Sequence, residues 1–568
     1  MMDFHLLRGK PFDLSNDDLE WVKSTFAGLT TDEKIGQLFF MVGYQQDEPF
    51  LKRLAGEIGI GGLMCRSMDK DSVMATVSAL QSSAEIPLLI AANLEAGGQG
   101  ITKDGTKIGS NLAIAATGDT ELAYQLGRIC ALEGSSVGAN YAFAPVVDVD
   151  YNFRNPITNT RTFGSDPERV KRMGAAYVKG AQEQGMAASI KHFPGDGVDE
   201  RDQHLVTSVN TFSPDEWDRT FGDIYRHLID EGAKTVMVGH IALPEYSKKL
   251  DPSLRDEEIL PASLAKELLN GLLREQLGFN GLILTDATTM AGMNIPMPRN
   301  ELVPRSIENG CDMFLFTKNL EEDVAFMKQG LENGLLSKER LDGAVMRILG
   351  LKASLGLHKK NNIPSPETAA AVLRNERHLS IAEQVADRSI TLVKEEAGVL
   401  PITSDRYKRV LLYDIESEAN ALGYNKSSGL AASFIPLLEA EGFEVTRFEP
   451  SGIYEGLQGS FTEMKDRYDL IVYLCNLATK SNQTTVRIEW INPMGVNVPI
   501  YMESIPTLFI STENPYHLLD VPRVKTYINT HGVNDYTLPL LVRKLAGRSE
   551  FKGKSPVDPF CGKWDTRL

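Results

Sequence analysis

The sequence MAASIKHFPGDG, residues 186–197, places an apolar segment directly before a cluster of polar side chains. Residues 186–190 are typical of a buried strand, and Lys191 and His192 follow them before a Pro-Gly-x-Gly turn. A further polar triplet, Asp202-Gln203-His204, comes soon after the turn. Charged groups that crowd together cost desolvation energy unless a ligand or partner offsets that cost. The stretch therefore predicts a strand that ends either in a polar site or in a well-solvated loop.

The spacing of Asp202 and His204 suits a carboxylate that orients an imidazole. Such a carboxylate can hydrogen-bond one ring nitrogen, fix the tautomer and raise the basicity of the other nitrogen. A single histidine in this position is more often an ordinary loop residue. With Asp202 beside it and the turn before it, a proton donor and acceptor is an equal alternative for His204.

Short apolar runs alternate with longer amphipathic ones between about residues 32 and 350. The amphipathic stretches, such as Thr120–Val137 and Pro167–Glu183, are expected to be helices. Eight strands joined by helical crossovers favour a TIM-like (β/α)8 barrel over an open sheet. The expected strands are Ile35–Met41, Ile58–Cys65, Pro87–Asn93, Tyr141–Val149, Met186–His192, Thr235–Ile241, Gly281–Asp286 and Asp312–Phe316.

Polar residues end most of these apolar runs. In a parallel barrel such positions meet at the C-terminal rim, where active sites lie, whereas an open sheet would gather ligand groups at one switch point. The pattern therefore predicts a site at the rim. The residues concerned are Asn93, Glu95, Asp148, Lys191, His192, His240 and Asp286.

The chain of 568 residues is too long for one ordinary domain. Residues 1–355 are predicted to form the barrel domain, and 356–379, which are polar and contain proline, a linker. Residues 380–568 are predicted to form a C-terminal α/β sandwich domain. Its expected strands are Ile390–Val393, Val410–Tyr413, Val445–Phe448, Leu470–Cys475, Thr507–Ile510 and Thr526–Ile528.

Bulk composition narrows the class of protein. A net charge of -17 disfavours nucleic acid and anionic membrane surfaces as partners. The five cysteines are scattered without a CxxC pair, which favours free thiols in a reducing compartment over disulfides or a zinc site. No leader or long apolar run is evident. We expect a cytoplasmic protein, monomer or homodimer, with no metal or cofactor and a small-molecule substrate.

Asp286 ends one apolar run and precedes Ala-Thr-Thr-Met. One interpretation is a helix N-cap, a common use of Asp where a strand joins a helix. The other is an ionised carboxylate at the barrel rim, suited to attack on an electrophilic carbon. A nucleotide-binding enzyme is disfavoured, because Gly97-Gly98 lacks the GxGxxG spacing.

The combined order is more specific than its parts. Lys-His-Phe-Pro-Gly-x-Gly-x4-Asp-x-His followed by Leu-Thr-Asp-x-x-x-Met resembles glycoside hydrolase family 3, in its β-N-acetylglucosaminidase branch. The resemblance covers about residues 30–350 and extends more weakly into residues 389–401. Further matches are Phe143-Ala-Pro-Val-Val-Asp-Val149, Arg161-Thr-Phe-Gly164, Gly278-Phe-Asn-Gly-Leu-Ile283 and Gly310-Cys-Asp-Met313.

This resemblance implies a retaining exo-β-glycosidase that removes terminal N-acetylglucosamine from cell-wall or chitin-derived saccharides. By the same resemblance Asp286 is the nucleophile, and His204, oriented by Asp202, is the general acid/base. A histidine is a reasonable substitute for the usual second carboxylate because its unperturbed pKa, about 6.5, lies near working pH. The residues implied to hold the sugar are Arg161, Lys191, His192 and Asn93.

Two positions depart from the branch. Asp196 stands where the branch usually has His, and Asn93 stands where it usually has Asp. The sugar therefore stays open, and a β-glucosidase or β-xylosidase of the same family is an alternative. A glycoside phosphorylase is another, because an imidazole repels an anionic acceptor less than a carboxylate does. A sugar-binding protein without turnover would not need Asp286, Asp202 and His204 together.

Overall fold

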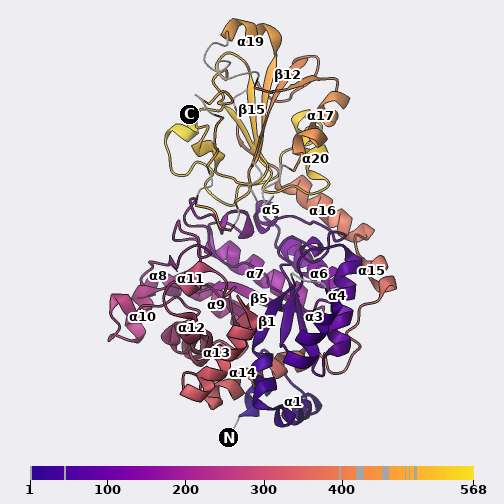
Figure 1. The fold of residues 1–568 in the computed structure, drawn as a ribbon. Helices are drawn as coiled ribbons and strands as arrows, with labels where there is room; N and C mark the ends of the chain where they lie inside the picture. Colours follow the sequence, from indigo (N-terminus) through magenta and orange to yellow (C-terminus); the bar gives the residue numbers. More distant parts are fainter. Residues whose placement is uncertain are drawn as a thin grey trace. The chain divides into compact units, whose positions relative to one another are not determined.

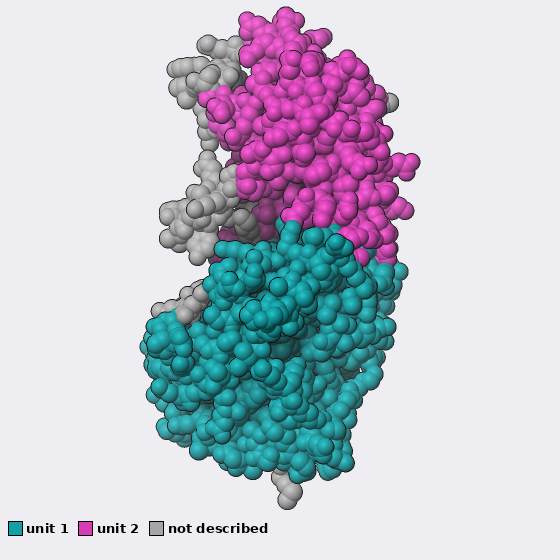
Figure 2. Space-filling model, turned by 90° about the vertical axis from the view of Figure 1, so that its right-hand side faces the viewer, with its two compact units in different colours: residues 1–107, 120–158, 167–379 teal, residues 108–119, 159–166, 380–568 magenta. Residues whose placement is uncertain are grey.

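The computed structural model describes residues 3–43, 47–395, 398–417, 428–450, 460–479, 481–484, 487–491 and 495–568. These residues form two compact units, coloured separately in Figure 2. Unit 1 contains residues 1–107, 120–158 and 167–379. Unit 2 contains residues 108–119, 159–166 and 380–568.

Unit 1 holds an eight-stranded sheet in the order β10-β1-β2-β3-β4-β5-β7-β9, in which every neighbouring pair is parallel. A parallel bridge between Leu284 and Met313 joins the last strand to the first and closes the ring. The predicted barrel is confirmed. Its strands are β1 (Phe39–Val42), β2 (Gly62–Met64), β3 (Leu89–Ala92), β4 (Tyr141–Ala142), β5 (Ala187–Phe193), β7 (Thr235–Val238), β9 (Leu282–Thr285) and β10 (Phe314–Leu315).

Helices surround these strands (Figure 1). In α7 the buried residues Val170, Met173, Tyr177 and Ala181 recur at helical spacing, so one face packs inward. The helices of unit 1 include α1 (Asn16–Gly28), α2 (Thr31–Gln37), α3 (Glu48–Lys52), α4 (Lys70–Ser83), α6 (Thr120–Ser136), α7 (Pro167–Gln182), α8 (Pro214–Arg219), α9 (Phe221–Asp230), α10 (Pro244–Leu250), α11 (Ala291–Asn294), α12 (Arg299–Glu308), α13 (Leu320–Asn333), α14 (Lys338–Ser354) and α15 (Pro366–Val372).

The first expected strand, Ile35–Met41, is partly wrong. Residues 35–37 belong to helix α2, which starts from a capping box in which the side chains of Thr30 and Glu33 bond each other's backbone N–H groups. The helix end and strand β1 are both buried, so they share one apolar run that periodicity cannot divide. The capping pair Thr30 and Glu33 marks the start of a helix and so distinguishes α2 from a strand.

Residues 356–379, expected as a linker, include helix α15 and belong to unit 1. The buried carboxylate of Glu133 in α6 accepts hydrogen bonds from the Arg374 backbone N–H, at 3.0 Å, and from His378 Nδ1, at 2.7 Å. These bonds fasten the segment to the barrel unit.

Unit 2 contains a six-stranded sheet in the order β11-β16-β15-β14-β12-β13, with β11 antiparallel to its neighbour and the rest parallel. Helices α17 (Leu430–Ala440) and α20 (Thr537–Leu545) supply the core on one face. The C-terminal α/β sandwich is confirmed. Its strands are β11 (Thr391–Lys394), β12 (Arg409–Glu416), β13 (Glu444–Arg447), β14 (Leu470–Asn476), β15 (Thr507–Ser511) and β16 (Thr526–Asn529).

The other face of this sheet carries a row of stacked aromatic rings. Tyr413, Tyr473, Phe509 and Tyr527 lie on four adjacent strands with ring centroids 4.5, 5.7 and 5.5 Å apart and interplanar angles of 14° or less. Each ring is directly opposite the next in the strand register. Cross-strand aromatic pairs of this kind stabilise a sheet.

Unit 2 also takes in two segments from the first half of the chain, which the sequence-based boundaries place in the barrel domain. Residues 108–119 contain helix α5 (Asn111–Ala116), and the Ser110 hydroxyl donates to the His531 carbonyl at 2.5 Å. Residues 159–166 are joined by a 3.1 Å hydrogen bond between the side chains of Asn159 and Asn514. Across the described residues, no helix combines the length and apolarity needed to cross a bilayer.

The Pro-Gly-x-Gly turn after β5 requires its glycines. Gly197 has a φ of +106°, and a Cβ placed on it would lie 1.9 Å from the Val149 carbonyl oxygen. The turn is also held from outside, because the Trp217 indole N–H donates to the Pro194 carbonyl at 2.7 Å. The backbone that leaves β5 is therefore fixed by close packing.

We predict that Gly197→Ala destabilises the protein by at least about 2 kcal/mol, since strain at positive φ and the contact with Val149 add together. Gly185→Ala is the matched control, because Gly185 also has positive φ (+76°) but nothing lies within 4 Å of its added Cβ. Unfolding midpoints in urea measure both. Equal losses in the two variants would contradict the proposed contact.

Candidate active site

Polar side chains from five strands come together at the carboxyl-terminal rim of the barrel. They follow β3, β4, β7 and β9 or lie in the last residues of β5, as parallel strands of a barrel require. The site is built from Glu95, Asp148, Lys191, His192, His240 and Asp286, joined by a loop that carries Asp196, Asp202, Gln203 and His204.

Asp286 directly follows β9 and is 6% exposed. Its Oδ1 accepts the Ala287 N–H at 2.7 Å, while the buried Oδ2 has no hydrogen-bond partner among the described residues and lies 3.7 Å from His192 Nε2. The N-cap alternative is not realised, because the next helix, α11, begins at Ala291 with Met290 as its cap. An unpaired carboxylate oxygen at a barrel rim is placed to meet a ligand.

Burial alone would raise the pKa of Asp286, but nearby imidazoles outweigh it. The charges of His192 and His204, together with the Ala287 N–H, lower the pKa of the Asp286 carboxyl below its ordinary value. Asp286 is therefore ionised at neutral pH. Because His204 contributes to this shift, the loop that carries it lies within electrostatic reach of Asp286.

His192 is held rigidly by Asp148. Asp148 Oδ2 contacts His192 Nδ1 at 2.7 Å, and Asp148 Oδ1 accepts the His192 backbone N–H at 3.0 Å. A carboxylate only accepts, so Nδ1 carries the hydrogen and Nε2 faces Asp286. The neighbouring Lys191 forms an ion pair of 2.7 Å with Glu95, and the two side chains are 3% and 17% exposed.

The Asp202–His204 pair has the geometry that its spacing predicts. Asp202 Oδ1 contacts His204 Nδ1 at 2.6 Å and accepts the His204 backbone N–H at 2.8 Å. The Asp202 side chain is fully buried, whereas that of His204 is 19% exposed. The carboxylate thus fixes Nδ1 as the protonated nitrogen and leaves Nε2 to exchange a proton with a ligand.

His240 is buried and bonds the backbone next to Asp286. Its Nε2 donates to the Ala287 carbonyl at 3.0 Å, and its Nδ1 lies 2.9 Å from the Ser263 hydroxyl. Burial lowers the pKa of His240 to about 4, so the ring is neutral at pH 7. It supports the backbone beside Asp286 without adding charge at working pH.

Asp196 is buried among polar groups. Its Oδ1 accepts from Asn155 Nδ2, at 2.8 Å, and from the Gly197 N–H, at 2.7 Å, and Gln203 Nε2 lies 3.4 Å from Oδ2. Burial and the charge of Asp148 raise the pKa of Asp196 to about 8. The carboxyl is therefore mostly protonated at neutral pH.

Two of the expected sugar-binding residues are positioned by other parts of the fold. Asn93 is exposed at the carboxyl end of β3. Arg161 belongs to unit 2, in the short helix η4 (Asn159–Arg161), where its carbonyl accepts from Asn111 Nδ2 at 2.6 Å. The roles of both in binding stay predictions.

Sequence reasoning missed the roles of Asn155 and Gln203. Both are buried amides bonded to Asp196, and neither follows a strand directly. Gln203 lies between Asp202 and His204, which was a usable signal, whereas nothing in the sequence distinguishes Asn155 from other loop asparagines. Asp148, Glu95 and His240 were recognised only as strand-end residues.

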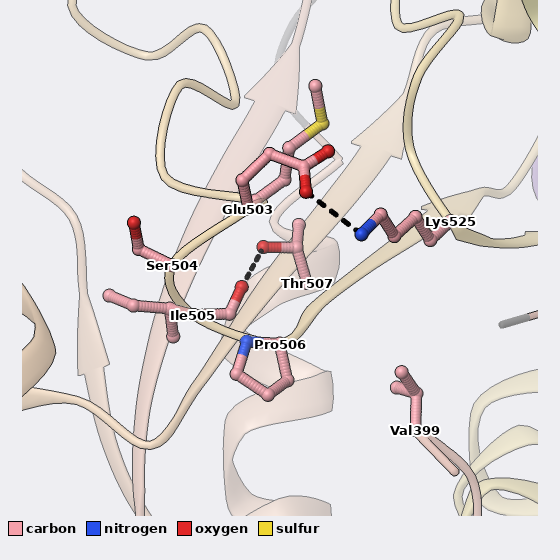
Figure 3. Close-up of a pocket in the computed structure, with 8 residues that line it drawn as sticks. Val399, Glu503, Ser504, Ile505, Pro506, Thr507 and Lys525 are labelled. Atoms are coloured by element: carbon pink, nitrogen blue, oxygen red, sulfur yellow. Dashed lines mark hydrogen bonds and ion pairs between the residues drawn. The ribbon is translucent and has the colours of Figure 1, made fainter. Parts of the chain in front are cut away.

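A surface pocket in unit 2 differs from this site in that polar groups of its lining bond one another (Figure 3). Its lining includes the ion pair of Lys525 with Glu503, at 3.0 Å, and Thr507, whose hydroxyl bonds the Ile505 carbonyl at 2.9 Å. The polar groups named here satisfy one another. The described residues include no cluster of three His, Cys, Asp or Glu side chains able to hold a metal ion.

Residues 30–351 match the N-terminal domain of glycosyl hydrolase family 3. The chain belongs to this family. A β-N-acetylglucosaminidase/β-glucosidase of Cellulomonas fimi is 54% identical over 562 residues, which cover 99% of this chain and all of that protein. β-Hexosaminidase A of Pseudoalteromonas piscicida is 30% identical over 386 residues, 62% of each chain.

Two solved structures superpose on nearly the whole chain. The β-glucoside phosphorylase BglX bound to 2FGlc superposes with a TM-score of 0.93 at 45% identity, covering 99% of this chain and all of that chain. A β-N-acetylglucosaminidase from Paenibacillus sp. str. FPU-7 has a TM-score of 0.79 at 24% identity, covering 94% of this chain and all of that one, and supports the fold. The family 3 chain described here is thus a glycoside-cleaving enzyme.

The protonated state of Asp196 predicts a pH dependence of stability. An unfolded Asp has a pKa near 3.9, so between about pH 4 and pH 8 the folded protein holds a proton that the unfolded chain has lost. The free energy of unfolding then falls as pH rises through this window, by up to about 1.4 kcal/mol per pH unit from this group.

Asp196→Asn cannot titrate, so its stability relative to wild type should improve between pH 5 and pH 8. Urea midpoints at both pH values measure this. Thr235→Val, which removes only a buried hydroxyl bonded to the Ala188 carbonyl, is the control and should follow the wild-type trend. A constant difference between Asp196→Asn and wild type would show that Asp196 is ionised throughout.

Proposed function

We propose that this family 3 enzyme is a retaining exo-β-glycosidase that removes terminal N-acetylglucosamine, and also glucose, from β-linked saccharides. The proposal is carried by Asp286, a buried and ionised carboxylate at the barrel rim. Its Oδ2 has no hydrogen-bond partner among the described residues. The inclusion of glucose is supported by the two activities in the name of the Cellulomonas fimi relative.

In the first step, Asp286 Oδ2 attacks the anomeric carbon and the bond to the leaving oxygen breaks. His204 Nε2 gives its proton to that oxygen, while Asp202 stabilises the imidazole through Nδ1. The product is a glycosyl ester on Asp286, and the ring of His204 is left neutral. In the second step, the neutral Nε2 takes a proton from water as it attacks the ester, and each displacement inverts the anomeric carbon.

We assign the sugar contacts to groups beside Asp286. His192, fixed by Asp148, offers Nε2 to a hydroxyl next to the anomeric carbon. Lys191, held by Glu95, supplies a buried cation for another hydroxyl or for an acetamide carbonyl. Asn93 completes the set in unit 1, as a neutral amide in place of the carboxylate usual in the branch, and Arg161 is assigned to the sugar by the family resemblance alone.

The first test compares 4-nitrophenyl N-acetyl-β-glucosaminide with 4-nitrophenyl β-glucoside. Wild type should cleave the N-acetylated substrate and, more slowly, the glucoside. Asp286→Ala should lower kcat by at least about 10⁴-fold on both, because the nucleophile is lost, and His204→Ala by about 10²- to 10³-fold. Absence of cleavage of both glycosides by wild type would contradict the proposal.

Phosphorolysis is a second candidate, favoured by the imidazole of His204. A carboxylate base would repel an incoming phosphate anion, whereas a neutral imidazole does not. The structural similarity to a β-glucoside phosphorylase adds support. Phosphate oxygen would then attack the glycosyl ester in place of water, the ester bond to Asp286 would break, and a β-sugar 1-phosphate would leave.

If phosphate is an acceptor, wild type should release nitrophenol several-fold faster with millimolar inorganic phosphate than in a phosphate-free buffer at equal ionic strength. The gain applies to substrates whose glycosyl ester breaks down in the slow step. Sugar 1-phosphate, measured by ³¹P NMR, should replace free sugar in the product. Sulfate serves as the control anion, since it should give no adduct. Free sugar alone, at a rate independent of phosphate, would leave hydrolysis as the reaction.

A further inference from the structure

The loop that carries His204 is attached to the barrel at several points. The Ala291 N–H, at the start of α11, donates to the His204 carbonyl at 3.0 Å, and the Thr207 hydroxyl donates to the Gly292 carbonyl at 2.8 Å. After the loop, β6 (Ser208–Val209) pairs with β8 (Ile241–Ala242). These bonds fix the backbone of the loop at His204 and at residues 207–209.

The side chain of Gln203 connects the loop to His240, which follows β7, and to the turn after β5. It is fully buried, and its Oε1 accepts the His240 backbone N–H at 2.7 Å. Because that N–H needs an acceptor, the amide cannot be flipped, and Nε2 must face Asp196 as a donor. Gln203 thus spans from the end of β7 to the turn after β5, directly between the two members of the Asp202–His204 pair.

Asp196 connects the Gln203 amide to Asp148 and His192. Its backbone N–H donates to Asp148 Oδ1 at 2.8 Å, and the same oxygen accepts the His192 backbone N–H. Asp196 Oδ1 accepts hydrogen bonds from Asn155 Nδ2 and from the Gly197 N–H, and its Oδ2 faces Gln203 Nε2. A continuous chain of contacts therefore runs from His192 through Asp148, Asp196 and Gln203 to the loop.

We propose that Asp196 is a positioning residue for the general acid. Through its contact with Gln203, it holds the Asp202–His204 loop where His204 can protonate the leaving oxygen of a sugar bound beside His192 and Asp286. This inference rests on the proposed glycosidase function and adds to it a role for the side chain that departs from the branch. Asp196 is buried and its side chain bonds Asn155, Gly197 and Gln203, so we expect its effect to pass through the placement of His204.

The leaving group separates positioning from a general structural effect. 2,4-Dinitrophenolate leaves without protonation, whereas phenol requires a proton from His204. A misplaced acid slows only the phenyl glycoside, while a damaged fold slows both. The measured quantity is the ratio of kcat/KM for the 2,4-dinitrophenyl glycoside to that for the phenyl glycoside, with the sugar that wild type prefers.

In Asp196→Asn, the amide oxygen can keep Asn155 and Gly197, but the new NH2 group cannot accept from Gln203 Nε2, as a carboxyl oxygen can even when it is protonated. We expect this ratio to rise at least about tenfold over wild type. Gln203→Glu replaces the amide donor by a carboxylate, to which the protonated Asp196 can donate, so it should raise the ratio less than Asp196→Asn does. In the double variant, which combines Asp196→Asn with Gln203→Glu, the introduced amide donates to the introduced carboxylate. The contact then re-forms with reversed polarity, and the ratio should return to within about threefold of wild type.

Thr235→Val is again the matched control, because it removes a buried hydrogen bond of the same barrel that does not contact the loop. Its ratio should equal that of wild type. If Asp196→Asn lowers both kcat/KM values by the same factor, or if the double variant shows the combined effect of the single ones, the positioning role is overturned. Inactivity of wild type on both aryl glycosides would instead overturn the glycosidase assignment and this inference with it.

Discussion

The buried carboxylate of Asp148 is the group on which the geometry of the site depends. Its Oδ2 contacts His192 Nδ1 at 2.7 Å, and its Oδ1 accepts the backbone N–H groups of His192 and Asp196, at 3.0 and 2.8 Å. Hydrogen bonds to a charged acceptor are stronger than neutral ones, and a fully buried carboxylate needs them to offset its desolvation. One side chain after β4 thereby fixes both the end of β5 and the start of the turn that leads to the His204 loop.

The same arrangement sets the charges of the site. Asp286 is kept anionic by the charges of His192 and His204. Asp196 is kept mostly neutral by burial and by the charge of Asp148, and His240 is kept neutral by burial. Within one polar cluster, the Asp286 carboxyl is thus anionic and the Asp196 carboxyl mostly neutral at neutral pH. A neutral Asp196 lowers the repulsion within the site, because several buried anions together would repel one another and destabilise the fold.

The family's usual pattern and this chain differ at Asp196 and Asn93, and the structure gives these differences unequal weight. Asp196 is buried and bonded to the amides of Asn155 and Gln203, and Gln203 lies between Asp202 and His204 in the loop. Asn93 is exposed at the end of β3. A side chain facing outward can change with the ligand that it meets, whereas a buried one must change together with its neighbours.

The amino-acid sequence by itself determined the barrel, the second α/β domain and the Asp202–His204 pair, because these depend on local periodicity, strand ends and a spacing of two residues. It misplaced the start of β1, where a buried helix end and a strand share one apolar run, and it put residues 108–119 and 159–166 with the barrel. Only the tertiary structure decided which polar residues meet: Asp148 with His192, 44 positions apart, Lys191 with Glu95, and Gln203 with Asp196. Sequence spacing assigns a residue to a strand end, but partners across strands are set by closure of the ring and by the path of the loops above it.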